Sequence, residues 1–115
     1  MKHNDLLERT FWFGVNSIKF LRTLPKEQEY YVIKNQLIKS ATSLGANYEE
    51  SQAGSSRPDF KNKVKIALRE TRESNYWLRV IEALNDSKSI ELEVLLKESN
   101  ELKKIFGAIV NNTKL

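Results

Sequence analysis

Residues 58–84 read PDFKNKVKIALRETRESNYWLRVIEAL, and apolar or small side chains recur along them at alternating spacings of four and three residues. This period brings those side chains to one face of an α-helix. Pro58 and Asp59 suit a first helical turn, because proline lacks an amide hydrogen that this turn leaves unpaired and an acid favours the positive end of the helix dipole. We therefore predict a helix over 58–84. Its buried face is expected to hold Phe60, Val64, Ala67, Thr71, Ser74, Leu78 and Ile81.

The same period recurs in three further segments, so helices are also expected over about 5–23, 26–53 and 89–112. Pro25 is expected in the first turn of the second helix, Gly54 beyond its end, and Ser89 as the N-cap of the last helix. Four long helices with short connections predict one all-α domain, 1–115, folded as an antiparallel up-down-up-down four-helix bundle. The expected core faces are Leu7, Phe11, Gly14, Ile18 and Leu21 in the first helix, Tyr30, Ile33, Leu37, Ala41, Leu44 and Tyr48 in the second, and Leu92, Leu95, Ser99, Leu102, Phe106 and Ile109 in the last.

The composition excludes several classes of protein and site. The chain has no cysteine, which excludes disulfide scaffolds, cysteine nucleophiles and thiolate-bound metals. Its only histidine is His3, whereas a di-iron bundle needs Glu-x-x-His motifs on two helices, so no metal site is expected. Phosphate-binding loops and known catalytic motifs are absent, so we expect no cofactor and no enzymatic activity. No apolar run approaches the ~18 residues that span a bilayer, and a cytoplasmic protein without membrane contact is expected.

Aromatic side chains exceed what one seam of a bundle needs. Phe11, Trp12 and Phe13 are consecutive, so they cannot all lie on one helix face, and Phe20 lies off the expected face. One interpretation is a broad core face, which globular helices often have. The other is an interface between protomers, because large exposed aromatic patches mark partner surfaces. The candidate interface residues are Trp12, Phe13, Phe20 and Trp77.

Polar residues also share a helix side next to the apolar faces of the second and third helices. We expect them to form a buried hydrogen-bond network between these helices, since polar groups at a bundle seam must find partners. The candidate members are Ser43, Asn47, Glu50, Glu70 and Ser74.

Positive charge is concentrated in the third helix. The chain carries a net charge of +4, and residues 54–85 hold seven basic and four acidic residues. Five of the basic residues recur every four or three positions and form a ridge within an arc of roughly 120°. A phosphate-contacting stripe is one interpretation, and an ordinary solvated face is the other. The ridge, as the name is used below, consists of Arg57, Lys61, Lys65, Arg69 and Arg72.

Two runs of sequence carry a resemblance to a known family. Residues 36–52 read QLIKSATSLGANYEESQ, and the later run combines Asp59-Phe60, KIAL at 65–68, Glu70, Glu73 and YWL at 76–78. Both resemble the 23S rRNA-intervening sequence proteins, a bacterial family of four-helix bundles. The resemblance implies a homopentamer arranged as a ring or short barrel and a link to ribosomal RNA. It also implies kinship with accessory proteins of diversity-generating retroelements, which bind RNA and a reverse transcriptase.

Together these features lead to two functional hypotheses. The first is a non-enzymatic homo-oligomer that binds structured RNA through the ridge, by charge and shape rather than by a known RNA-binding motif. The second is a scaffold whose ring surface binds a protein partner without nucleic acid. The excess aromatic residues support both hypotheses equally.

Overall fold

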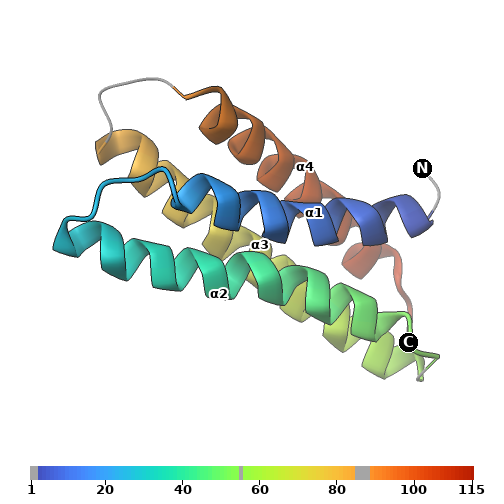
Figure 1. The fold of residues 1–115 in the computed structure, drawn as a ribbon. Helices are drawn as coiled ribbons and strands as arrows, with labels where there is room; N and C mark the ends of the chain where they lie inside the picture. The colour runs from blue at the N-terminus through green and yellow to red at the C-terminus, as the bar shows by residue number, and fades with distance from the viewer. Residues whose placement is uncertain (1–2, 55, 85–88) are drawn as a thin grey trace.

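The computed structural model describes residues 3–54, 56–84 and 89–115, with side chains from Asp5 onward. Its helices run antiparallel to their chain neighbours and form one bundle (Figure 1). The most extensive contact joins α2 and α3, and the least extensive joins α1 and α4. This arrangement confirms the all-α antiparallel bundle. The helices are α1 (His3–Leu21), α2 (Gln28–Ser51), α3 (Arg57–Leu84) and α4 (Ile90–Asn112).

The helix ends follow local backbone chemistry. α2 begins at Gln28 rather than near Pro25, because Glu27 is still extended and takes the N-cap position. Gly54 follows α2 with φ 81°, the left-handed conformation that glycine adopts without steric cost. Ser89 caps α4 as expected, since its Oγ accepts a hydrogen bond from the amide of Leu92 at 3.2 Å.

The core faces of three helices are nearly as predicted. All six residues expected on α2 are buried, as are six of the seven on α3 and five of the six on α4. Phe60 on α3 and Ile109 on α4 are half-buried and pack against the same core. Spacings of three and four residues therefore identified the buried side of each of these three helices correctly.

The predicted core face of α1 is wrong in part. The buried residues are Leu6, Thr10, Phe13, Ser17 and Phe20, together with Gly14 and Leu21 from the predicted face. Leu7 and Ile18 are half-buried, and Phe11 is 59% exposed. The buried face includes two small hydroxyl residues, which hydropathy marks as polar. Thr10 can be buried because its hydroxyl donates to the Leu7 carbonyl of its own helix at 3.1 Å.

Two glycines set the close approach of α1 and α2. A Cβ at Gly14 would lie 3.2 Å from the carbonyl oxygen of Ala41, and one at Gly45 would lie 3.1 Å from that of Thr10. Both obstacles are backbone atoms, which cannot rotate away. The two helices therefore pack with backbone against backbone at this point.

We expect Gly45→Ala to lower the free energy of unfolding. Overpacking typically costs about 1–3 kcal/mol, more than alanine gains over glycine in a helix. Gly107→Ala is the matched control, because a Cβ there meets nothing within 4 Å. That change should raise stability by up to about 1 kcal/mol. Urea denaturation measures both, and equal stabilisation by the two variants would contradict the close approach.

Ser17 provides a second stability test, because its buried Oγ has no hydrogen-bond partner among the described residues. An unpaired buried hydroxyl costs roughly 1–3 kcal/mol, so we expect Ser17→Ala to stabilise the protein. Ser74 is also fully buried, but its Oγ donates to the Oγ of Ser40 at 2.8 Å. Ser74→Ala should therefore lower the denaturation midpoint while Ser17→Ala raises it. A loss of stability in both variants would show that Ser17 is paired in solution.

Candidate nucleic-acid interface

The ridge runs along the solvent side of α3. Contacts on each flank of the helix fix this orientation: Ser74 bonds Ser40 of α2, whereas Asn75 bonds Ser99 of α4 at 2.9 Å. Because one flank of α3 packs on α2 and the other on α4, the ridge residues lie on the remaining side, which faces solvent. Lys61 is half-exposed, and the other four ridge residues are exposed. The structure thus brings all five predicted basic residues to one accessible face.

Few acceptors neutralise the ridge. Arg69 approaches Glu70 at 3.8 Å between Nε and Oε1, and Arg57 donates to the backbone carbonyl of Lys114 at 3.1 Å. Within the described part of the chain, no carboxylate lies within 4 Å of the nitrogens of Lys61, Lys65 or Arg72. Those three charges are consequently available to an anionic partner.

Arg9 shows the contrasting case of a cation already engaged. Its guanidinium contacts Glu98 through Nε at 2.9 Å and Nη2 at 2.6 Å, and Glu101 at 3.1 Å. The hydrogen bond to Glu98 raises the pKa of Arg9 above its usual value. This ion pair ties α1 to α4, where helix contact is least extensive, so its role is structural.

The outward side of α3 continues the ridge with two further residues, Tyr76 and Arg79. The ridge and these two residues together are called the basic face below. Tyr76 and Arg79 follow Arg72 at spacings of four and three, so they continue the outward stripe. Arg79 lies over the Tyr76 ring, with 5.8 Å between its Cζ and the ring centroid. The alternation of four and three residues, counted on from Arg72, predicts that Tyr76 and Arg79 lie on the same side of α3. The predicted ridge does not include Arg79, although ~100° per residue places it at the same angle as Lys61.

One lysine of α4 lies on the side of that helix that borders α3. Lys103 is half-buried and lies one turn after Ser99, the residue that bonds α3. By helical spacing it therefore borders α3 rather than α1. No such position was predicted, because the sequence alone did not show which side of α4 faces α3.

The predicted polar network between α2 and α3 is largely wrong. Asn47 donates from Nδ2 to the carbonyl and hydroxyl oxygens of Ser43, at 2.9 and 3.0 Å, within its own helix. Glu50 is exposed, and Glu70 lies beside Arg69. Only Ser74 reaches across, to Ser40. An asparagine amide finds acceptors one turn back in its own helix, so it does not need the neighbouring one.

The predicted interface aromatics divide between core and surface. Phe13 is 2% exposed and Phe20 is also buried, so both belong to the core and neither offers a surface to a partner. Trp77 is half-buried, packs against the core and donates from Nε1 to Glu73 at 3.2 Å. Trp12 is 46% exposed and meets Phe11 edge to face, with ring centroids 5.3 Å apart. The outward aromatic pair is therefore Phe11–Trp12.

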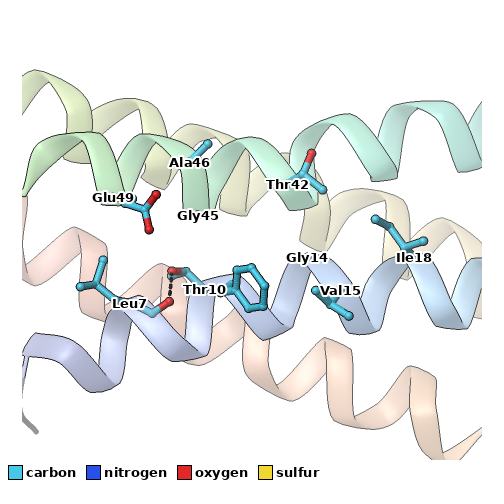
Figure 2. Close-up of a pocket in the computed structure, with 10 residues that line it drawn as sticks. Leu7, Thr10, Gly14, Val15, Ile18, Thr42, Gly45, Ala46 and Glu49 are labelled. Carbon is cyan, nitrogen blue, oxygen red and sulfur yellow. Dashed lines mark hydrogen bonds between the residues drawn. The ribbon is translucent and has the colours of Figure 1, made fainter.

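A groove of about 290 Å³ lies between α1 and α2, and Phe11 of this pair is one of its lining residues (Figure 2). Gly14 and Gly45 are among its lining residues, and Leu7, Val15 and Ile18 line its α1 side. Of the residues that line it, only Glu49 ionises. The groove therefore offers an apolar contact surface with a single carboxylate at one end.

In the described ranges, no group of three or more His, Cys, Asp or Glu side chains is placed to hold a metal ion. None of the helices described is both long and apolar enough to cross a membrane.

The sequence and the fold both match known proteins. The family model described as 23S rRNA-intervening sequence protein matches residues 2–108. Among solved structures, the chain is similar to a protein of unknown function from the S23 ribosomal protein family of Bacteroides thetaiotaomicron, with a TM-score of 0.82 and 31% identity. That match covers 92% of this chain and 98% of the other. No curated protein matches the chain.

Proposed function

The chain belongs to the 23S rRNA-intervening sequence protein family, and from this premise we propose that it is a non-enzymatic, homo-oligomeric, cytoplasmic module that binds structured RNA. The binding surface is the basic face of α3. The observation that carries the proposal is the ridge, whose charges are outward and mostly without carboxylate partners among the described residues.

The dimensions of the basic face suit an extended polyanion. Arg57 and Arg79 are 22 residues apart in sequence, which corresponds to roughly 33 Å along a helix at ~1.5 Å per residue. Cations distributed over such a length neutralise several phosphates and release their counterions. The expected affinity is therefore strongly salt-dependent and depends little on base sequence.

Assembly would multiply this effect. We propose a homopentamer, as the family resemblance implies, in which the Phe11–Trp12 pair contacts a neighbouring protomer. Burying an aromatic side chain contributes roughly 2–3 kcal/mol, which favours covering such a pair. Repeated basic faces around a ring would bind a long RNA with avidity.

A second candidate function is a protein-binding scaffold. The apolar groove between α1 and α2 favours it, because a partner helix could lay an apolar face there. In that case binding would depend on Val15 and Ile18 rather than on the ridge, and salt would have little effect.

For the RNA function, we expect Lys61→Glu with Lys65→Glu to abolish binding to a labelled RNA hairpin without changing particle size. Each lost phosphate contact should lower the salt slope by about one. Fluorescence anisotropy across a salt series measures both quantities. Lys19→Glu with Lys39→Glu is the matched control, because it makes the same charge change at exposed positions on α1 and α2.

Two results would contradict this assignment. If the wild-type protein has no RNA affinity even at low salt, the scaffold function is favoured. If both double variants weaken binding equally, net charge rather than the ridge is responsible.

For assembly, we expect Phe11→Ser with Trp12→Ser to give smaller particles in light scattering while helical circular dichroism is retained. Both side chains are exposed in one chain, so the fold should survive. Tyr31→Ser is the control, since Tyr31 on α2 is 68% exposed and lies outside the groove. A wild-type protein that is monomeric at micromolar concentration would overturn the proposal.

A further inference from the structure

We propose that Tyr76 and Arg79 form a stacking site for an unpaired RNA base at one end of the phosphate-contacting ridge. The inference rests on the proposed function and deepens it, because it names the class of RNA: a duplex or hairpin with unpaired nucleotides next to it. The ridge would hold the backbone, and this pair would hold a base.

The pair is exposed yet held in place. Tyr76 is 49% exposed, and its ring centroid lies 5.0 Å from that of Trp77 at an interplanar angle of 77°. Trp77 packs against the core and therefore braces Tyr76. Arg79 lies over the tyrosine ring and donates from Nε to Oδ1 of Asn75 at 3.0 Å.

Asn75 anchors the arginine to the bundle. It is buried, and its Nδ2 donates to Ser99 at 2.9 Å and to Asn100 at 3.4 Å, both on α4. Its amide orientation leaves Oδ1 as the acceptor for Arg79. The hydrogen bond to Asn75 therefore holds the Arg79 guanidinium beside the contact between α3 and α4. A preorganised site loses less conformational entropy when a ligand binds.

The chemistry of this pair fits a nucleobase. Unpaired bases stack on aromatic rings and on arginine guanidinium planes, whereas bases inside an A-form duplex are already stacked and cannot be reached this way. Lys65, Arg69, Arg72, Tyr76 and Arg79 follow one another at spacings of four, three, four and three. The ring therefore lies within a line of cations, one turn beyond Arg72.

Charge favours RNA over an apolar peptide as the occupant. Arg72 and Arg79 flank the tyrosine on its own stripe, and neither has a carboxylate within 4 Å among the residues that the structure describes. The nearest acid along the chain, Glu73, bonds Trp77 instead. An aromatic ring between two cations that have no carboxylate partner suits a ligand that alternates phosphates with flat bases.

The test compares a labelled hairpin that has an unpaired loop with a blunt duplex of equal phosphate number, using Tyr76→Ala. Loss of one stacked base corresponds to about 5- to 150-fold in affinity, and we expect this loss for the hairpin alone. The salt slope should not change, because no phosphate contact is removed. Tyr76→Phe keeps the ring and should keep the preference. Tyr31→Ala removes a tyrosine on α2 that is more exposed than Tyr76 and should change nothing.

Each other outcome decides against the site. Equal weakening for hairpin and duplex, or no weakening for either, with intact helical circular dichroism, would overturn the stacking site and leave the ridge proposal standing. A wild-type protein that binds neither RNA would overturn both proposals. Retained hairpin preference in Tyr76→Ala would show that the unpaired loop is recognised elsewhere on the protein, which would overturn the stacking site, and lost binding in Lys61→Glu with Lys65→Glu would leave the ridge proposal standing.

Discussion

The packing of α3 between α2 and α4 is the constraint on which the other surfaces of this molecule depend. Fully buried Val64, Ala67 and Leu78 draw α3 into the core, and hydrogen bonds to both neighbours fix its rotation. Once that rotation is set, the opposite side of the helix must face solvent. Because the ridge occupies this side, its orientation follows from core packing and does not require any interaction among the basic residues themselves.

The α1–α2 contact has a comparable consequence for the other side of the bundle. Gly14 and Gly45 allow the helix backbones to approach, and the small Thr10 and Ser17 turn into the core. Larger side chains at these positions would separate the helices or rotate α1. With α1 rotated as it is, Phe11, Val15 and Ile18 lie outside the core and line the groove. Basic and apolar surfaces therefore come from different helix pairs.

Because these surfaces are separate, the proposed assembly through α1 and the proposed RNA binding through α3 are compatible. In the homopentamer proposed above, a protomer that met its neighbours through α1 would leave α3 free for a polyanion, and repetition of α3 around the ring would increase the effective concentration of cations. The Ser40–Ser74 and Asn75–Ser99 contacts join the α3 side to both neighbouring helices. Since buried polar contacts lose free energy when one partner is misplaced, they favour a single rotation of α3.

The sequence by itself determined the number of helices, their approximate bounds, the buried faces of α2, α3 and α4, and the ridge. Each follows from a period of 3.6 residues acting on unambiguous apolar or basic side chains. It did not determine the rotation of α1, because Leu7, Phe11 and Ile18 form as apolar a series as Leu6, Phe13 and Phe20. Only contact with Gly45 and the rest of the bundle decides between them. The partners of Asn47 and Asn75 were likewise decided by tertiary structure. An amide can bond its own helix or its neighbour, and the distance between helices selects which acceptor it reaches.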